Sequence, residues 1–397
     1  MRLRTVRSVF VAMAVVAGLG LHLEGWTSGS DQAAGNWLGA PQLIAPGVEL
    51  YTSQDPTLVE PAGPSALYLL KLDPAKVTLS SAHAYDEMIG LETADVIAAR
   101  HHAIAAVNAG FFNTRNGDPA SVLKISGELV SDTSSPRGVV AISAAGQGRQ
   151  TLTFDQLSAK QDLRFTAAGK DWVLPVDGVD TTRARGKLML YTPMYHADTD
   201  TALNGTEIIA SGAPLTVREV RPNMGHTPIP RDGVVFSYGG LELPPALAAL
   251  SPGVKISLTM NWKSLNNVPA SVFESAVDIV NGAGLLRRAG QVIEDWKPES
   301  LSPTSFLDVR HPRTVIGVDD RGFVWLIAID GRQAAYAVGM TFRELQRLCD
   351  RLRLRDALNL DGGGSVTMVA NNRIVNRPSD PTGPRAVSDV ILVKVRR

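Results

Sequence analysis

The chain has 397 residues, of which 39 are Lys or Arg and 39 are Asp or Glu, so its formal net charge at neutral pH is zero. This balance gives no electrostatic reason to expect a nucleic-acid partner. The length admits two or three average domains, and a hydrophobic share of 44% is ordinary for a folded chain with a sizeable core.

The N-terminus has the layout of a secretory signal peptide, since three arginines within the first seven residues precede an apolar run over residues 9–21. We therefore assign residues 1–35 to a signal peptide and leader, and we expect an exported protein, periplasmic or secreted. The run is shorter than the roughly 20 residues that a spanning helix needs, so we expect no stable membrane span after signal removal. An uncleaved signal-anchor is the alternative.

Short strands separated by turns dominate residues 36–150, which we take as the first part of a core. Residues 66–72 and 77–82 are predicted strands, and residues 93–101 can form a short helix with Thr93 as its N-cap. A hairpin follows over residues 121–130, with Gly127 at its turn.

An apolar strand from residue 103 ends in a polar and aromatic turn that holds Asn108, Gly110, Phe112 and Asn113. Such a turn suits a carbohydrate site, because rings stack on the apolar faces of sugars while amides bond hydroxyls. A turn with an aromatic anchor is the alternative reading of the same residues.

Residues 151–265 continue the alternation of strands and turns, and we predict that they form an inserted β-rich section or subdomain. Their one charged cluster is His196-Ala-Asp-Thr-Asp, followed by Asn204, Gly205 and Glu207. The cluster fits the calcium-loop template only in its first two carboxylates. The sequence therefore identifies no metal ligands and no certain cofactor, and it leaves a divalent cation open.

Residues 266–397 form the second part of the predicted core. Three of its acidic or basic residues lie at the ends of apolar strands: Asp278, Arg313 and Asp330. Thr341 and Glu344 have the spacing of a reciprocal helix cap. On the helix that they open, Cys349 shares the apolar face, so we expect a buried packing residue; as the single cysteine it can form no internal disulfide.

The run from Asn359 to Met368 is the most unusual stretch. Three consecutive glycines follow an apolar segment, and Asp361 and Ser365 lie on either side of them: Gly362, Gly363 and Gly364. Glycine in a row costs conformational entropy unless something approaches the backbone closely, so the loop predicts an anion or sugar site. An ordinary glycine-rich hairpin is the alternative.

The chain ends in an apolar strand preceded by Arg385, Ser388 and Asp389. Strand-turn-strand units outnumber helical patterns throughout, and no regular βαβ alternation appears. We therefore predict an α+β fold of strand-rich mixed sheets with few helices.

Five motifs in this order resemble the phosphodiester glycosidase family: Val107-Asn-Ala-Gly-Phe-Phe-Asn, Arg313-Thr-Val-Ile-Gly-Val-Asp, Asp330-Gly, Asn359-Leu-Asp-Gly-Gly-Gly-Ser and Ala386-Val-Ser-Asp-Val. The first motif departs from the animal members, which have a second glycine where this chain has Ala109. The resemblance implies a strand-rich catalytic core and a hydrolase that cleaves a sugar 1-phosphodiester, of the N-acetylglucosamine type or of an envelope glycan.

On this hypothesis a carboxylate supports the oxocarbenium-like centre or activates water, and an arginine with backbone amides holds the phosphate. We assign the carboxylate roles to Asp361, Asp330 and Asp278. The phosphate is assigned to Arg313, the amides of Gly362, Gly363 and Gly364, and the Ser365 hydroxyl, with Lys124 and Arg385 as further candidates. The sugar is expected to face Asn108, Phe112 and Asn359, and Gly110 and Ser388 are further substrate-binding candidates.

Two other functions would use the same loop. The first is a non-catalytic protein that binds exopolysaccharide or another envelope glycopolymer. The second makes Ser365 the nucleophile of an esterase, which the sequence disfavours, because Gly-Gly-Gly-Ser is not the Gly-x-Ser-x-Gly elbow and no histidine is evidently paired with it.

Overall fold

The computed structural model describes residues 37–86, 89–145, 148–240 and 242–396. Residues 36–397 form one compact unit. The predicted signal peptide lies outside the described residues. Within the described ranges, no helix has the length and apolar character needed to cross a membrane.

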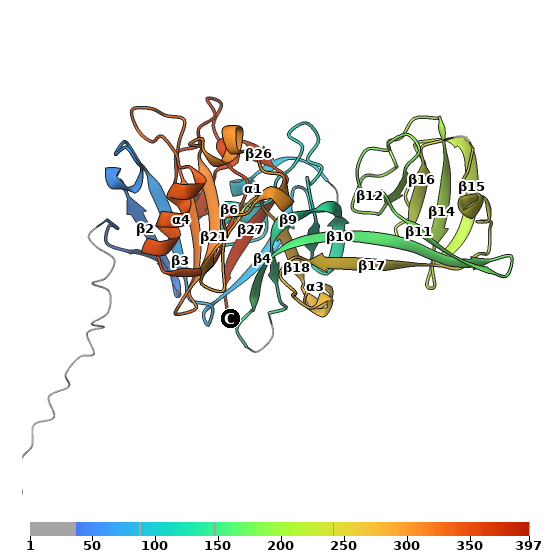
Figure 1. Cartoon of the computed structure of the whole chain (residues 1–397), viewed down its shortest axis with the longest axis horizontal. Coiled ribbons are helices and arrows are strands. Elements are labelled where there is room, and N and C mark those ends of the chain that lie inside the picture. The colour runs from blue at the N-terminus through green and yellow to red at the C-terminus, as the bar shows by residue number, and fades with distance from the viewer. Residues whose placement is uncertain (1–36, 87–88, 146–147, 241, 397) are drawn as a thin grey trace, which may run out of the picture. The chain divides into compact units, whose positions relative to one another are not determined.

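Two antiparallel sheets pack face to face and form the main sandwich (Figure 1). The first has eight strands in the order β1 (Gln42–Ala45), β2 (Val48–Ser53), β3 (Leu67–Leu72), β22 (Val324–Ile329), β21 (Arg313–Asp319), β23 (Leu354–Asn359), β19 (Leu285–Arg288) and β20 (Gln291–Val292). The second has five strands in the order β25 (Arg373–Ile374), β24 (Met368–Ala370), β6 (Ala105–Asn108), β27 (Asp389–Val395) and β4 (Val77–His83).

The alternation of apolar residues along the strands explains this layering. On β3, Leu70 and Leu72 belong to the core between the two sheets, whereas Leu67 and Leu69 belong to a second core on the outer face. A period of two places successive side chains on opposite faces, so a strand that is apolar at every position is buried on both.

A helix covers the outer face of each sheet. Helix α4 (Phe342–Arg351) buries its apolar side on the eight-stranded sheet, and α1 (Ala94–Arg100) packs on the five-stranded one. The predicted capping box of Thr341 and Glu344 is confirmed, as is the burial of Cys349. Thr93 lies at the N-cap of α1, but its side chain makes no capping hydrogen bond there.

A third sheet has seven strands and is referred to as the curled sheet. Its strands are β11 (Lys170–Pro175), β10 (Leu152–Ala167), β9 (Thr133–Ile142), β18 (Asp278–Asn281), β7 (Leu123–Ile125) and β8 (Glu128–Ser131), with β17 (Ile256–Ser264) paired to the free edge of β10. The hairpin of β7 and β8 turns at Gly127, which has φ +89°, so the predicted hairpin is confirmed. Helix α3 (Ala270–Ser275) lies between β17 and β18 in the sequence.

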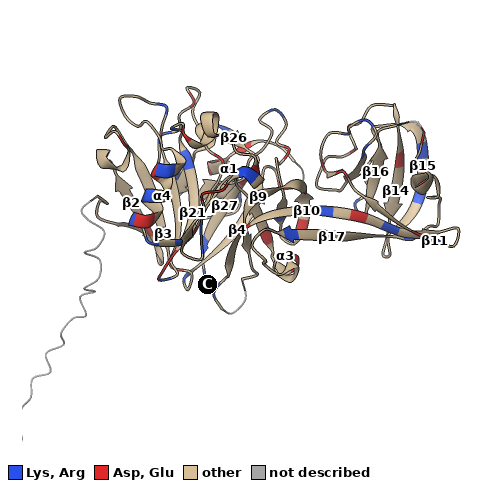
Figure 2. Ribbon diagram, in the orientation of Figure 1, with Lys and Arg blue, Asp and Glu red and all other residues tan. Residues whose placement is uncertain are grey.

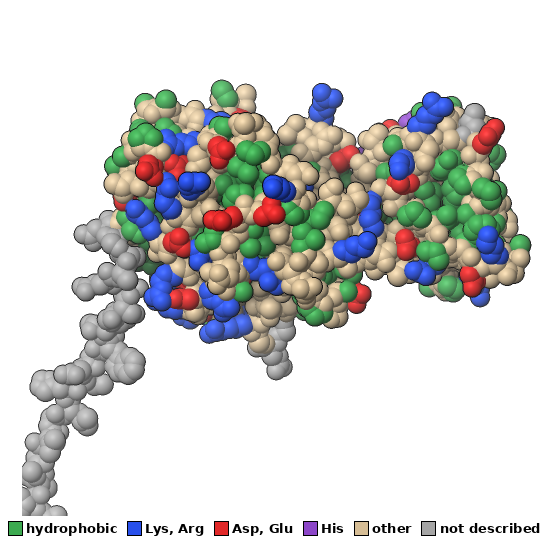
Figure 3. Space-filling model, in the orientation of Figure 1, with side chains coloured by type: hydrophobic (Ala, Val, Ile, Leu, Met, Phe, Trp, Pro, Cys, Tyr) green, Lys and Arg blue, Asp and Glu red, His purple; other side chains and the backbone are tan. Residues whose placement is uncertain are grey.

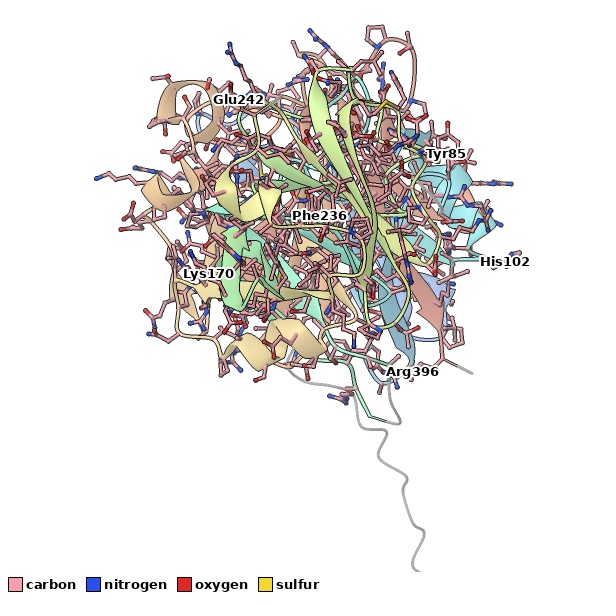
Figure 4. The ribbon with its side chains drawn as sticks, turned by 90° about the vertical axis from the view of Figure 1, so that its right-hand side faces the viewer. Tyr85, His102, Lys170, Phe236, Glu242 and Arg396 are labelled. Atoms are coloured by element: carbon pink, nitrogen blue, oxygen red, sulfur yellow. The ribbon has the colours of Figure 1, made fainter. Side chains whose placement is uncertain are left out.

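A fourth sheet, the satellite sheet, comes entirely from the predicted insert. Its strands are β12 (Gly178–Val179), β13 (Leu188–Tyr191), β16 (Gly233–Tyr238), β14 (Gly205–Ser211) and β15 (Thr216–Met224), with helix α2 (Pro245–Ala248) after them. Phe236, near the middle of the view in Figure 4, is fully buried in the core of this sheet. A two-stranded ladder of β5 (Glu92–Thr93) and β26 (Ala386–Val387) completes the strands that bear on the site.

The predicted strand-rich α+β fold class is confirmed, since strands outnumber helices and form several sheets that differ in the number and order of their strands. The domain boundaries at residues 151 and 265 stay a prediction, because β10 and β17 carry the chain from the curled sheet to the satellite sheet without a break in pairing. Acidic and basic residues are interspersed along the same elements and over the face drawn in Figure 3, so that face carries no extended basic patch (Figures 2 and 3).

Candidate active site

Asp361 lies where the first and fourth sequence motifs meet. Strand β23 ends at Asn359, and two residues later the amide of Asp361 donates a hydrogen bond to the carbonyl of Ala109 (2.9 Å). The side-chain amide of Asn108 donates to the carbonyl of Asp361 (2.7 Å). Two segments about 250 residues apart are therefore joined by hydrogen bonds to the main chain of Asp361.

A second carboxylate, Asp389, enters from the first residue of β27. Its Oδ2 accepts a hydrogen bond from the amide of Gly110 (3.1 Å), and the residue is only 1% exposed. Its Oδ1 has no hydrogen-bond partner among the described residues. Asp389 belongs to the last of the five motifs, but no role is predicted for it from the sequence; its position at the start of an apolar strand is the signal that could identify it.

Gly110 separates Asp389 from Asn281, the last residue of β18. A Cβ at Gly110 would lie 2.7 Å from Asn281 Nδ2 and 3.0 Å from Asp389 Oδ1, so any larger residue would push these groups apart. Asn281 is buried; its Oδ1 accepts from the amide of Phe111 (2.9 Å), while its Nδ2 has no partner among the described residues. Asn281 was not predicted, because only the fold brings its strand to this turn.

Burial raises the pKa of both carboxyl groups. For Asp361 the pKa rises to about 6, because desolvation outweighs the opposing effects of Ser365, the Gly362 amide, Arg385 and Arg332. Asp361 is partly exposed to solvent, whereas Asp389 is buried.

For Asp389 the pKa rises to about 7, because desolvation and the charge of Asp361 together outweigh the bond from the Gly110 amide. The effect of one carboxylate on the other indicates that the two groups titrate as a pair. Two carboxyl groups whose pKa values are raised toward neutrality can hold and release a proton near pH 7, which suits acid–base chemistry.

The three glycines let the loop pass beneath two arginines. Gly363 has φ +62°, and a Cβ on it would lie 3.0 Å from the guanidinium of Arg332. A Cβ on Gly364 would collide with the guanidinium of Arg385. The predicted close approach to the glycine backbone is therefore made, in the described structure, by side chains of the protein itself: the guanidinium groups of Arg332 and Arg385 and, at Gly364, also the carboxylate of Asp380.

Most of the loop amides are already used. The amide of Gly362 donates to Asp361 Oδ1 (2.8 Å), that of Gly363 to the carbonyl of Pro312 (2.9 Å), and that of Ser365 to the carbonyl of Gly362 (3.2 Å). The Ser365 hydroxyl is fully buried and lowers the pKa of Asp361, although it is not in hydrogen-bonding geometry with any described group. The loop therefore orients the Asp361 carboxylate through the Gly362 amide, whereas the amides of Gly363 and Ser365 are not free to bind an anion.

Arg332 and Arg385 are the cations beside Asp361. Arg385 makes a bidentate ion pair with Asp380 (2.8 and 3.2 Å), and Arg332 is exposed, with its Nη2 3.3 Å from Nδ1 of His311. Burial lowers the pKa of His311, and the charges of Arg313 and Arg332 lower it further against a bond to Ser305, so His311 is neutral near pH 7 and its ring nitrogen can accept from Arg332. Arg332 was not predicted.

Arg313 binds backbone carbonyls of the protein and is not exposed beside the glycine loop. Its Nε donates to the carbonyl of Met340 (3.1 Å), and its Nη2 donates to the carbonyls of Phe306 (2.5 Å) and Val309 (3.2 Å). The guanidinium packs against the adjacent rings of Phe306 and Phe342, 4.6 and 4.8 Å from their centroids. This environment favours a structural role over the predicted phosphate clamp.

Asp330 also has a fully occupied environment. It accepts hydrogen bonds from Asn376 Nδ2 (2.8 Å), the amide of Arg377 (2.9 Å) and the Tyr336 hydroxyl (3.3 Å). Burial raises its pKa against these bonds. Because Asn376 also accepts from the amide of Met368 (2.7 Å), Asp330 steadies the strand that leaves the glycine loop.

Asp278 and Lys124 lie together, at the other end of β18 from Asn281. Asp278 Oδ1 accepts from the Ser81 hydroxyl (2.9 Å) and the amide of Ser126 (3.1 Å). Asp278 and Asn281 are three positions apart on β18, which places them roughly 10 Å apart on opposite faces of the strand. Neither Asp278 nor its lysine neighbour is therefore brought to the Asp361–Asp389 pair.

The remaining predicted residues surround the pair without facing a common point. The Oδ1 of Asn108 accepts hydrogen bonds from the Thr314 hydroxyl (2.7 Å) and the Thr367 amide (3.1 Å). The side-chain amide of Asn359 donates to the carbonyls of Ala283 and Leu360 (2.9 Å each). The ring of Phe112 packs on the core beneath α1, and Gly110 lies against Asp389. The carbonyl of Ser388 accepts a hydrogen bond from the Ala84 amide (2.8 Å).

One group among the described residues has the composition and spacing of a metal site. It consists of Asp198, Asp200 and His226, which are half-buried or exposed. Glu207, the acidic residue of the predicted cluster, is instead fully buried and accepts hydrogen bonds from Thr199 (2.8 Å) and Thr201 (2.6 Å). The group comes from the satellite sheet and its loops, not from the carboxylate pair.

Comparison with known proteins supports the motif reading. The sequence profile of the phosphodiester glycosidases matches residues 204–394, which include Asp361, Asp389, Arg332 and Arg385. The chain resembles the phosphodiester glycosidase family.

The mouse N-acetylglucosamine-1-phosphodiester alpha-N-acetylglucosaminidase is 28% identical over 172 residues, which cover 42% of this chain and 30% of the mouse protein. The human enzyme of that name is 32% identical over 121 residues, covering 29% and 23%. The chain thus matches less than a third of the length of these relatives.

Solved structures share the fold. A hypothetical protein from Synechocystis superposes with a TM-score of 0.73 at 22% identity, over 89% of this chain and 63% of that one. A protein from Burkholderia pseudomallei K96243 superposes with a TM-score of 0.70, also at 22% identity, over 84% and 74%. The fold that this chain shares with these two proteins therefore extends through most of the described residues.

Proposed function

We propose that this chain is a hydrolase that cleaves the bond between the anomeric carbon of a sugar and a phosphodiester. The observation that carries the proposal is the pair of enclosed carboxyl groups, Asp361 and Asp389, whose pKa values are raised toward neutrality beside Arg332 and Arg385. The family resemblance supplies the substrate class, a glycosyl 1-phosphodiester.

The reaction needs charge stabilisation more than leaving-group protonation, because a phosphate ester leaves readily from an acetal carbon. In the proposed step, ionised Asp361 supports positive charge at the anomeric carbon while the carbon–oxygen bond to phosphate breaks, and the phosphate departs with the bonding electron pair. Water adds to the anomeric carbon, and its proton passes to the carboxylate pair and then to solvent. The products are a free sugar and a phosphomonoester.

The two arginines would hold the phosphate in this proposal. Their guanidinium groups lie above Gly363 and Gly364, next to Asp361, and arginine is suited to planar, bidentate recognition of phosphate oxygens. Asp380 would release or share Arg385 when the anion binds. Arg332, which has only a neutral histidine as its hydrogen-bond partner in this region, is the more available of the two.

Asp389 would act through Asp361. Because Asp389 is buried behind Gly110 while Asp361 is half-exposed, the sugar would meet Asp361 first. A proton on Asp389 leaves Asp361 as the single negative charge of the pair, so Asp389 controls the ionisation state of the group that contacts the substrate.

The direct test is turnover. The purified protein is incubated with a panel of nucleotide sugars and sugar phosphodiesters, with and without a chelator, and free sugar and phosphomonoester are quantified. The proposal expects both products from at least one substrate and loss of both in the Asp361→Asn variant. Retention of a glycopolymer on the protein with no product from any substrate would instead support the non-catalytic glycan-binding function.

A further inference from the structure

A cavity of about 310 Å³ lies inside the curled sheet. One wall is apolar and comes from alternate residues of β17, namely Leu258, Met260 and Trp262. Polar groups come from Gln161 on β10 and from the opposite wall, which is formed by the β7–β8 hairpin with Lys124 and by α3 with Glu274. Its volume falls at the small end of the range for ligand pockets, about 300–1,000 Å³.

The cavity exists because the sheet bends back on itself. Strand β17 pairs with the edge of β10, whereas β7 and β8 lie at the far end of the strand order, yet residues of all of these strands line one cavity. In the register of β10 and β17, Gln161 lies directly opposite Met260, so both side chains face the interior of the curl. The mouths of curled or closed sheets are common ligand sites.

Trp262 gives the apolar wall a fixed aromatic surface. Its ring stacks on Phe273 of α3, with centroids 5.9 Å apart and planes inclined by 29°. Phe273 is fully buried, so the contact holds the indole in place. A half-exposed indole steadied by a buried ring offers the flat apolar surface on which the C–H face of a sugar ring packs.

The polar groups of the cavity have unused hydrogen-bonding capacity. Lys124 Nζ donates to the carbonyls of Phe273 (3.2 Å) and Glu274 (2.8 Å), and an ammonium has three donors. Gln161 is 91% buried, its Oε1 has no partner among the described residues, and the same is true of the Trp262 indole N–H. Unpaired buried groups carry a desolvation cost that a bound hydroxyl would relieve.

The charge of the cavity is balanced. The ammonium of Lys124 interacts with the carboxylates of Asp278 and Glu274, so it is not an isolated positive centre. An anionic ligand such as phosphate would meet two carboxylates for one ammonium. A neutral ligand that combines an apolar face with hydroxyl donors and acceptors matches the walls better.

We propose that this cavity is an accessory binding site for one neutral sugar ring of a glycan, stacked on Trp262 and hydrogen-bonded by Gln161 and Lys124. The site is separate from the carboxylate pair, since Asp278 and Lys124 lie at the opposite end of β18 from Asn281. The inference does not depend on the reaction proposed at Asp361, because a sugar can bind here whether or not the pair is catalytic.

The test uses the full-length protein and three disaccharides without phosphate: maltose, cellobiose and N,N′-diacetylchitobiose. Binding is measured by ligand-observed saturation-transfer NMR and titrated to a dissociation constant. We expect at least one disaccharide to bind, and we expect Trp262→Ala and Gln161→Ala each to weaken that binding by about tenfold or more, the effect of removing a central contact. Trp172→Ala removes a half-buried indole of β11 outside the cavity and should leave binding unchanged.

Two results would overturn the proposal: no binding of any of the three disaccharides to the wild-type protein, or binding that survives in both cavity variants. Thermal unfolding is recorded for each variant, and if Trp262→Ala is unfolded, the folded Gln161→Ala variant decides alone. Binding lost in Asp361→Asn but kept in both cavity variants would assign the sugar to the carboxylate pair and would also reject the accessory site.

Discussion

Asp361, in the loop after β23, and Asp389, the first residue of β27, approach the backbone of residues 109 and 110 from different sides of the sequence, and the charge of Asp361 raises the pKa of Asp389. The Ala109 carbonyl accepts the amide of Asp361, and the next amide donates to the carboxylate of Asp389. A single peptide unit therefore sets the geometry of both acids. Since neither acid has a salt bridge to compensate its burial in the described structure, the pair is a candidate for chemistry rather than a stabilising ion pair.

Replacing Asp361 tests whether this carboxylate supports the anomeric centre. Asp361→Asn keeps the shape and the acceptor for the Gly362 amide but removes the charge. We expect kcat for a sugar phosphodiester to fall by about 10³-fold or more, with a smaller change in KM, because the lost interaction is with the transition state. Asp278→Asn, a buried carboxylate outside the pair, is the matched control and should keep kcat within about tenfold of the wild type. Equal activity of wild type and Asp361→Asn would remove Asp361 from the mechanism.

The pH dependence of kcat/KM should follow the pair. If Asp361 must be ionised and Asp389 protonated, activity rises through a pKa of about 6 and falls through a pKa of about 7, which gives a narrow bell. In Asp389→Asn the neutral amide imitates the protonated acid. The fall on the alkaline side should then disappear while the rise on the acidic side remains. If kcat/KM of Asp389→Asn fell at alkaline pH as that of the wild type does, a group other than Asp389 would be responsible for the fall.

The same variant should change stability in a pH-dependent direction. The pKa of Asp389 in the folded protein is raised to about 7, above the value of about 4 expected in the unfolded chain, so ionisation at high pH favours unfolding. Asp389→Asn removes that cost, and we expect the free energy of unfolding at pH 8 to rise by roughly 1–3 kcal/mol. The gain should shrink as the pH falls through about 7 and vanish near pH 4. Urea denaturation at pH 8, 6 and 4 measures it, and a stability gain independent of pH would contradict the assigned burial.

Local signals in the sequence predicted much of the fold. The spacing of Thr341 and Glu344 predicts a capping box because the two bonds are made within one turn of helix. The turn at Gly127 needs φ above zero, which glycine supplies wherever a hairpin of this length forms. Such features depend on neighbours in the chain, so they can be derived without the fold.

The roles of the acidic residues could not be derived in the same way. Asp330 follows an apolar strand and Asp389 begins one, and the sequence gives no reason to assign a catalytic role to one and a structural role to the other. In the structure, the donors that satisfy Asp330 come from residues 336, 376 and 377, whereas Asp389 keeps an oxygen without a partner. Which carboxylate is satisfied depends on long-range packing, and the same holds for Arg313, whose acceptors come from two separate loops.

Removal of Arg332 should weaken binding of the phosphate group and also change the acid limb. Arg332 lowers the pKa of Asp361, so Arg332→Ala should move the acidic inflection of kcat/KM to higher pH. We expect kcat/KM to fall by about 10- to 100-fold, and inhibition by inorganic phosphate to weaken in parallel. Arg343→Ala, an exposed arginine on α4, is the control. A loss of activity with no change in phosphate inhibition or in the pH profile would mean that Arg332 acts only on the fold of its loop.

Arg313 provides the sharpest separation between a structural and a phosphate-binding arginine. Three carbonyls accept from its guanidinium, and two aromatic rings pack against it, so Arg313→Met should leave the carbonyls of Met340, Phe306 and Val309 without their donor. We expect the free energy of unfolding to fall by about 3 kcal/mol, the scale for removing one partner of a buried charged network. Denaturant unfolding measures this loss, and kcat/KM at low temperature, where the variant remains folded, should stay within about tenfold of the wild type. The opposite pattern, full stability with kcat/KM reduced by about 10³-fold, would return the phosphate to Arg313 and exclude Arg332 as its main ligand.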